Sequence, residues 1–321
     1  MLDYEKLEEG IFLVRSNSIF GTSCNGILIK NVENSGNILI DCNFHENELQ
    51  ELSESLKNNI KSYFVSHTHL DHISNIHFYE DHGFKIYCPI PEDRYLKDMN
   101  IFMKENGMVD CEVDNIFSNI IYEELNFKNL KNVETFKPGK TFNYGKISLE
   151  TYHIPGHSPG HTAFLIRDKT KRRRAVLFVS DIGIEKSGPW YGLKHCSLKD
   201  YRISIKKIEE IYLNDDIILA SAHGKSYFTK QLQIFKNALN RIEINEEKVL
   251  KIYNSEKPKD LKEITLKGVY YSENHIKRLP PDSKKIHFVW EWYIILHHIN
   301  ELIEKGKVKK IDPEHKILVF N

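Results

Sequence analysis

The stretch SHTHLDHISN, residues 66–75, places three histidines and an aspartate in six consecutive positions. It follows the apolar run SYFVS, which is typical of a short buried strand. Alternate residues of an extended segment point to the same side, so His67 and His69 face one point together. Asp71 and His72 come after the chain turns toward a helix and reach a second point a few ångströms away. The HxHxDH spacing therefore predicts one wall of a site for two metal ions.

Four ligands are too few for two metals, and three later stretches offer more. HIPGHSPGH contains His153, His157 and His161 in a tight Pro- and Gly-rich loop. VLFVSDIG and ILASAHG end apolar runs at Asp181 and His223. A strand-end aspartate alone is more often a turn or capping residue, and a strand-end histidine alone is usually structural. The ordered set is far more specific, and strand ends are where α/β folds collect their sites. It predicts a metal centre.

The order of the remaining patterns predicts an α/β fold with two sheets covered by helices. Strand-like runs alternate with helix-like periodicity, and residues 91–130 form a helix-leaning insertion. One amphipathic helix, YRISIKKIEEIY, has an inner face predicted from its isoleucines: Ile203, Ile205, Ile208 and Ile211.

The chain changes character after residue 224, which predicts a catalytic domain over 1–224 and a helical region over 225–321. The second part carries 19 Lys/Arg and 13 Asp/Glu, a net of +6, and the first part therefore has −6. It contains a long helix that Gly306 ends, and then two predicted short strands around DPEH. Helices followed by a small hairpin suggest a winged-helix-like module.

In motif order, residues 10–224 resemble the metallo-β-lactamase superfamily, whose fold is an αββα sandwich. The matching motifs are IDCN, SHTHLDH, PGHSPGH, SDIG and AHG. The resemblance implies one metal bound by His67, His69 and His157, a second bound by Asp71, His72 and His223, and Asp181 as the bridge. It leaves His153 outside the motif and makes His161 and Asp41 outer residues that orient the ligands. The C-terminal region resembles the winged-helix extension of some members.

Two zinc ions are the first expectation for such a set, with iron or manganese as alternatives. They would lower the pKa of a bridging water to near neutrality. Asp71 would ligate and also steer the proton of the resulting hydroxide. Tyr191, in the GPWYG loop, and Lys225 are candidates for meeting transition-state or substrate charge. The alternative for Tyr191 is a packing aromatic, and the alternative for Lys225 is a solvated lysine.

These features predict a hydrolase of a small thioester, lactone or other ester. A nuclease is the first alternative, because of the positive C-terminal region and its winged-helix resemblance. The apolar run WEWYIILHH argues against it, because such a helix is expected to be buried. A mononuclear iron sulfur dioxygenase is the second alternative, and it would not require His72 or His223. His69 stands where the oxygen-reducing diiron branch has a carboxylate, which disfavours that branch.

The expected partner is a small-molecule substrate, with nucleic acid less favoured and a homodimer through the helical tail as a further option. No apolar run reaches the roughly 18 residues of a membrane span. The start MLDYEKLEEG lacks the apolar core of a secretory signal. The five cysteines are scattered with no CxxC pair, which argues against disulfides and a thiolate metal site. A cytoplasmic protein is expected.

Overall fold

The fold is described from a computed structural model, over residues 2–17, 23–32, 36–170, 173–256 and 260–309. Within these residues the strands form two sheets. The larger has the order β1-β2-β3-β4-β5-β6-β7, with the strands Asp3–Glu8, Ile11–Asn17, Ser23–Val32, Gly36–Ile40, Ile60–Phe64, Lys85–Pro89 and Glu134–Phe136. The smaller has the order β12-β11-β10-β9-β8, in chain order Thr141–Tyr144, Ile147–His153, Thr162–Asp168, Ala175–Phe178 and Ile217–Ala220.

Strand direction brings the predicted ligands to one edge. Strands β1 to β4 pair antiparallel, whereas β4 to β7 pair parallel, and β11 pairs parallel with β12. The carboxyl ends of parallel strands meet at the same edge of a sheet. The segments that follow β4 and β5 therefore emerge together at one edge of the larger sheet, and those that follow β11 and β12 emerge together at one edge of the smaller sheet. These segments carry the motifs around Asp41, His67, Asp181 and His223.

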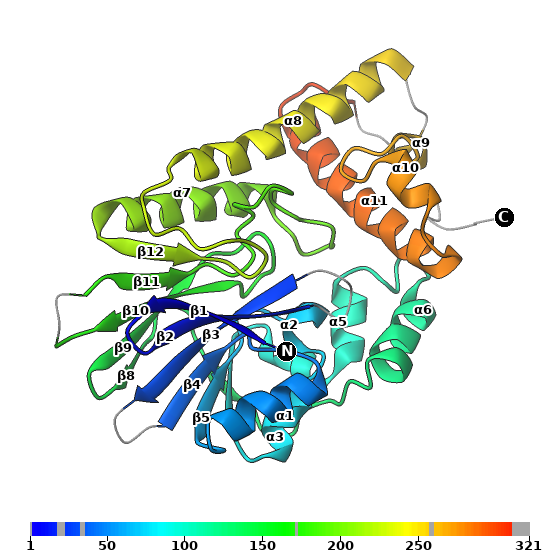
Figure 1. The fold of residues 1–321 in the computed structure, drawn as a ribbon. Helices are drawn as coiled ribbons and strands as arrows, with labels where there is room; N and C mark the ends of the chain where they lie inside the picture. The colour runs from blue at the N-terminus through cyan, green and yellow to red at the C-terminus, as the bar shows by residue number, and fades with distance from the viewer. Residues whose placement is uncertain (1, 18–22, 33–35, 171–172, 257–259, 310–321) are drawn as a thin grey trace.

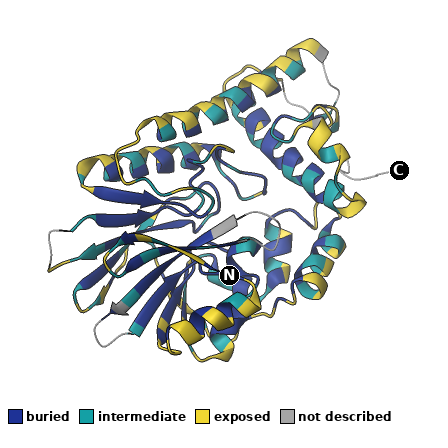
Figure 2. Cartoon of the chain, in the orientation of Figure 1, coloured by how far each residue is buried: buried dark blue, intermediate teal, exposed yellow. Residues whose placement is uncertain are grey.

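Each sheet turns one face to the other sheet and one face to helices (Figure 1). Between the sheets, Phe64 of β5 lies with its ring edge-on to Phe164 of β10, at a centroid distance of 6.0 Å. The residues of this inner layer come from both sheets and are buried, among them Leu13, Ile27, Ile38, Leu149 and Val176. A separate core lies between the sheets and the helices, and Figure 2 shows the central strands largely buried and the outer helix faces exposed. The predicted αββα sandwich is confirmed.

The helices of the sandwich follow the predicted order. They are α1 (Glu46–Ser55), α2 (Leu70–Ile73), α3 (His77–Asp81) and α7 (Leu198–Asn214). The insertion over residues 91–130 is helical as expected, with α4 (Asp93–Lys97), α5 (Met99–Glu105), α6 (Asp114–Asn119) and the π-helix η1 (Ile120–Glu124).

The predicted inner face of α7 is wrong at one position. Ile205 and Ile208 are fully buried, but Ile203 is 56% exposed. The buried row runs through Tyr201, Ile205, Ile208 and Tyr212. That row keeps the spacing of four, three and four residues that one helix face requires, and residue 203 falls on the opposite side. The tyrosines, rather than the isoleucines alone, define the face that packs on the sheet.

The C-terminal region is helical, with α8 (Gln233–Glu256), α9 (Leu261–Thr265), α10 (Glu273–Lys277) and α11 (Pro281–Glu304). Gly306 follows α11 with a φ of +68°, as a helix stop requires. Helix α8 packs on α7, and α11 packs on α8 and α9. The two strands predicted around DPEH lie outside the described residues, so the winged-helix hairpin and the boundary at residue 224 stay predictions. In the described part of the chain, no helix is both long and apolar enough to span a membrane.

Candidate metal centre

The structure brings all seven predicted ligands together at the edge where the strands end. They form two groups, and within each group the potential ligand atoms lie within 4.8 Å of one another. We call His67, His69 and His157 the imidazole group. We call the other four the mixed group: Asp71, His72, Asp181 and His223. These are the two sets that the superfamily resemblance implied, with Asp181 as the residue expected to belong to both.

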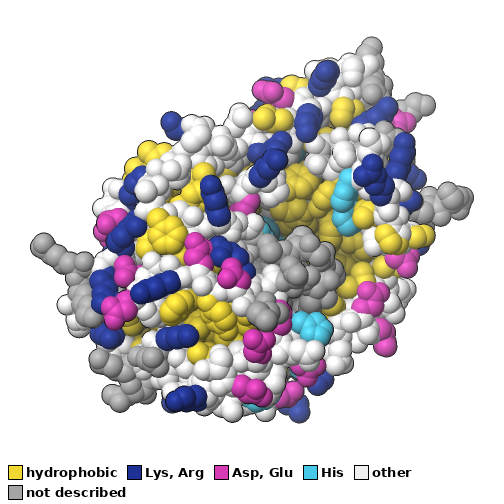
Figure 3. Space-filling view, viewed as in Figure 1, with side chains coloured by type: hydrophobic (Ala, Val, Ile, Leu, Met, Phe, Trp, Pro, Cys, Tyr) yellow, Lys and Arg dark blue, Asp and Glu magenta, His cyan; other side chains and the backbone are white. Residues whose placement is uncertain are grey.

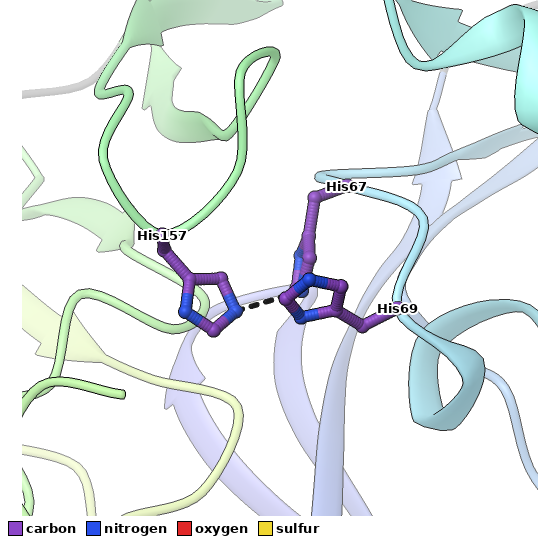
Figure 4. Close-up of side chains that lie close together, drawn as sticks. All are labelled: His67, His69 and His157. Carbon is purple, nitrogen blue, oxygen red and sulfur yellow. Dashed lines mark hydrogen bonds between the residues drawn. The ribbon is translucent and has the colours of Figure 1, made fainter. Parts of the chain in front are cut away.

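The imidazole group comes from two loops. His67 and His69 follow β5, and His157 lies between β9 and β10 (Figure 4). The Nε2 atoms of His67 and His157 are 3.2 Å apart, and the ring centroids of His69 and His157 are 4.4 Å apart. Burial, together with the neighbouring imidazoles, holds the pKa of His67 and of His69 well below its usual value. Both rings are therefore neutral at physiological pH, which is the form that binds a metal.

Hydrogen bonds on the outer side of the rings orient this group. His157 donates from Nδ1 to the carbonyl oxygen of Trp190, at 2.8 Å, which leaves Nε2 as the acceptor nitrogen. His67 Nδ1 lies 3.0 Å from the hydroxyl of Ser66. Partners of this kind set the tautomer of a ligating histidine and direct its free nitrogen toward the metal.

A carboxylate that the sequence analysis did not single out joins the two loops. Glu92 is 1% exposed, and its oxygens accept from the amide of Thr68, at 3.2 Å, and from the hydroxyl of Thr68. They also accept from the hydroxyl of Ser158, at 2.6 Å, and from the amide of Gly160, at 2.8 Å. Thr68 lies between His67 and His69 in the chain, and Ser158 follows His157. Glu92 thus fixes both loops that carry the imidazole group.

Nothing in the local sequence, CPIPEDRY, distinguishes Glu92 from a surface glutamate. A weak signal lies in the other loop, where Gly160 has no side chain to obstruct the approach. A Cβ at position 160 would lie 2.4 Å from Cγ of Glu92, which is closer than any real contact. Glycine is therefore required at position 160 for the carboxylate of Glu92 to reach the loop.

The mixed group is assembled from three places: the start of α2, the segment after β11 and the segment after β12. His223 Nε2 lies 3.1 Å from Asp71 Oδ2 and 3.2 Å from Asp181 Oδ2. His72 Nε2 lies 3.4 Å from Asp181 Oδ1. Asp181 also lies 3.4 Å from Nε2 of His157, in the imidazole group. Its carboxylate therefore stands between the two groups, where a bridging ligand is expected.

The charges of the mixed group compensate one another. Burial alone would lower the pKa of His72 and of His223, but the carboxylates of Asp71 and Asp181 outweigh it and raise both values well above the usual one. Burial acts in the opposite sense on the two aspartates, and the imidazoles outweigh it, so their pKa values are lowered. A cavity that stabilises protonated imidazoles between carboxylates is also one that favours a cation.

Two buried atoms show that a metal ion would fit here. Nε2 of His72 and Oδ1 of Asp181 face each other at 3.4 Å, yet neither forms a hydrogen bond of good geometry with the described residues. Buried polar atoms are rarely left in this state unless a water or an ion completes them. Both atoms belong to the mixed group, and imidazole nitrogen with carboxylate oxygen is a donor set for zinc, iron or manganese.

The outer residues occupy their expected places. Asp41 accepts from Nδ1 of His72, at 3.0 Å, and from the amide of Ser66, at 2.8 Å. His161 accepts from the backbone amide of Asp181, at 3.2 Å. His153 is exposed and lies 2.8 Å from the carbonyl oxygen of Pro159, and it belongs to neither ligand group.

The two proposed charge-binding residues are not brought into either group. Tyr191 is fully buried, and its hydroxyl meets Nε2 of His298, at 2.8 Å, and the amide of Asn245, at 2.9 Å. These contacts join the loop of Tyr191 to α8 and α11, as the packing alternative expects, and the catalytic role of Tyr191 stays a prediction. Lys225 is exposed, with Nζ 5.4 Å from the ring centroid of Tyr227, and its role as a substrate clamp stays a prediction.

Comparison with known proteins agrees with this geometry. The sequence profile of the Metallo-beta-lactamase superfamily matches residues 19–223. Hydroxyacylglutathione hydrolase GloC of Haemophilus influenzae is 28% identical over 201 residues, which cover 60% of this chain and 81% of the relative.

Solved structures show the same fold. The metallo-beta-lactamase family protein TTHA1429 of Thermus thermophilus superposes with a TM-score of 0.70 at 18% identity, covering 96% of this chain and 98% of the other. A Beta-lactamase domain protein of Burkholderia ambifaria gives 0.67 at 15% identity, covering 97% and 91%. The likeness in fold therefore extends beyond the sandwich into the C-terminal helices.

Proposed function

The chain belongs to the metallo-beta-lactamase superfamily, and we propose that within it the protein is a dinuclear-zinc hydrolase of small thioesters, lactones or other esters. One observation carries this proposal: two ligand groups from both sheets meet at the same end of the sandwich, and the carboxylate of Asp181 stands between them. Sites with this arrangement support attack by a metal-bound hydroxide on a carbonyl carbon.

When bound, the metal pair would supply a hydroxide at neutral pH and polarise the carbonyl under attack. The chain's own residues position that chemistry. The imidazole group offers three ring nitrogens from two loops that Glu92 joins. Asp71 would offer its carboxylate to the second metal and steer the proton of the attacking hydroxide. Asp41 holds the ring of His72 in place.

The mixed group favours two metals over one. A mononuclear iron dioxygenase would not need His72 or His223, yet both lie within reach of Asp71 and Asp181. The GloC relative is named a hydroxyacylglutathione hydrolase, which makes thioesters the first substrates to test.

Metal analysis and a substrate panel test the proposal. We expect two equivalents of zinc per chain and turnover of S-lactoylglutathione, an acyl-homoserine lactone or a simple aryl ester, with no cleavage of RNA. One equivalent of iron with no ester turnover would contradict it, and cleavage of RNA alone would replace it with a nuclease. A homodimer through the C-terminal helices also stays a prediction, which light scattering of the full chain can test.

A further inference from the structure

A row of aromatic side chains begins at the imidazole group and leads away from it. The ring of Trp190 lies edge-on to His69, with centroids 5.4 Å apart, and 5.7 Å from the ring of His157. Trp190 belongs to the segment between β11 and α7, and its carbonyl already holds His157 in place. The side chain therefore stands directly beside the proposed reaction centre.

The row continues into the C-terminal region. Nε1 of Trp190 donates to the hydroxyl of Tyr271, at 2.6 Å, and the ring of Trp190 is 5.6 Å from that of Trp290 on α11. His287 completes the row, at 4.7 Å from Trp290 and 5.1 Å from Tyr271. We call these four residues the aromatic wall: Trp190, Tyr271, His287 and Trp290.

The aromatic wall differs from an ordinary core because its members stay accessible. All four are only partly buried. By contrast, Tyr191, next to Trp190 in the chain, and Trp292, two residues after Trp290, are buried. Figure 3 shows hydrophobic side chains gathered in a hollow on the face where the C-terminal helices approach the sandwich. Partly exposed aromatic side chains beside a polar centre are typical of a ligand site.

Backbone contacts hold the wall in position. The buried carboxylate of Glu291 on α11 accepts from the amides of Val269, Tyr270 and Tyr271, the last two at 3.0 Å. This fixes the segment that presents Tyr271 against the helix that presents Trp290. A rigid surface of this kind binds a flat or apolar group without first losing side-chain entropy.

Close packing holds the other end of the wall. A Cβ on Gly192 would lie 2.8 Å from Cζ2 of Trp190 and 2.9 Å from Cβ of Trp290, so only glycine lets the two tryptophans meet. The segment after β11 and helix α11 therefore contribute to one surface, although they are distant in the chain.

We propose that the aromatic wall binds an apolar group of the substrate, so that the enzyme prefers esters and thioesters carrying an aromatic or other large apolar substituent. This inference rests on the proposed hydrolase function. It assigns the C-terminal helices a direct part in substrate selection. It also sets this protein apart from an enzyme built for small hydroxyacyl groups alone.

Matched substrates test the preference. With the zinc-loaded full-length protein, kcat/KM is compared for acetyl and phenylacetyl thioesters of one thiol, and for ethyl and benzyl thioacetates. In at least one of the two pairs, we expect kcat/KM for the substrate with the aromatic substituent to be about tenfold higher or more, as one well-filled apolar pocket allows. Equal values in both pairs would overturn the proposal.

Single substitutions then test whether the substrate preference depends on the aromatic wall. Trp290→Leu should remove most of the advantage of the large substrate through KM, and should leave the small substrate within about twofold. The control is Trp292→Phe, two residues along the same helix but buried, which should keep the preference. A preference that survives in Trp290→Leu would overturn the proposal, and Tyr271→Phe offers a milder change should Trp290→Leu fold poorly.

A binding measurement separates this inference from the function on which it rests. Two of the three tryptophans lie in the wall, so phenylacetate should quench the fluorescence of the zinc-loaded protein and acetate should not. Quenching without hydrolysis of any ester would contradict the proposed function and support the wall. Hydrolysis without preference or quenching would contradict the wall and leave the function standing.

Discussion

The two ligand groups lie side by side, but they are held together by different physical means. The imidazole group has no carboxylate of its own, and burial together with neighbouring imidazoles lowers the pKa of His67 and of His69. The mixed group contains two carboxylates and two imidazoles that attract one another directly. A group without opposite charges must be held in place from outside, whereas a group that contains both signs of charge contributes to its own assembly.

The buried carboxylates behind each group reflect this difference. Glu92 bonds to the backbone and hydroxyl groups of the two loops and shapes the path of the chain. Asp41 bonds directly to the ring of His72 and also to the amide of Ser66. One carboxylate thus positions loops, and the other orients a ligand. Substitutions at each should affect different halves of the centre.

Replacing Asp71 by alanine should have the largest effect, because it removes one of the two carboxylates that hold the mixed group. We expect kcat/KM for the preferred ester to fall by about a thousandfold or more, equivalent to about 4 kcal/mol, with an unchanged far-UV circular dichroism spectrum. Asp110→Ala is the control, since Asp110 forms a surface ion pair with Lys194. Activity within tenfold of the parent would contradict the role of Asp71.

Glu92→Gln should come next and should weaken the imidazole group selectively. The amide would present N–H groups toward donors such as Ser158 and Gly160, so the loops would lose their common anchor. We expect metal affinity at the imidazole group to fall by about 10- to 100-fold, the usual range for an outer partner. Metal titration by calorimetry measures it.

The neighbouring Asp93→Asn is the matched control, because its carboxylate pairs with Lys97 on the same helix and touches neither ligand loop. If metal affinity is unchanged in both Glu92→Gln and the control, the two ligand loops hold their shape without the carboxylate of Glu92.

Asp41→Asn should give a smaller loss, about tenfold in metal affinity, and should affect the mixed group through His72. The asparagine oxygen can still accept from one of the two donors, so part of the contact survives. Spectroscopy of the cobalt-substituted protein can follow the two sites separately. Should Asp41→Asn and Glu92→Gln weaken both sites alike, the two groups would act as a single unit and the contrast between them would fail.

Tyr191→Phe should have the smallest effect on activity, within about threefold, because its hydroxyl is engaged with Asn245 and His298 away from both groups. The free energy of unfolding should instead fall by about 1–2 kcal/mol, since two buried polar groups lose a partner. Denaturant unfolding and steady-state kinetics measure both quantities, and the exposed Tyr4→Phe is the control. A hundredfold loss of activity at unchanged stability would support the catalytic interpretation instead.

Much of the centre was predictable because its signals are local. The HxHxDH spacing depends only on the alternation of an extended segment and the turn that follows it. Asp181 and His223 each end an apolar run, and parallel strands bring such ends together. The expected ligand sets and the αββα layers follow from these short-range patterns, which need no knowledge of distant contacts.

Residues whose role depends on a distant partner were not predictable. Tyr201 belongs to the buried face of α7 because the sheet lies against it, whereas the isoleucine pattern alone favoured Ile203. The GPWYG loop left both a charge-binding and a packing role for Tyr191, and only the packing of α8 and α11 shows where its hydroxyl lies.

The sequence by itself determined which residues can bind metal and in what order they emerge from the sheets, because those properties depend on residue type and spacing. Tertiary structure alone decided that Glu92 joins the two loops and that Trp190, Tyr271 and Trp290 form one surface. The physical reason is that buried hydrogen bonds and aromatic contacts join segments far apart in the chain. Their strength depends on close approach, and no local pattern records it.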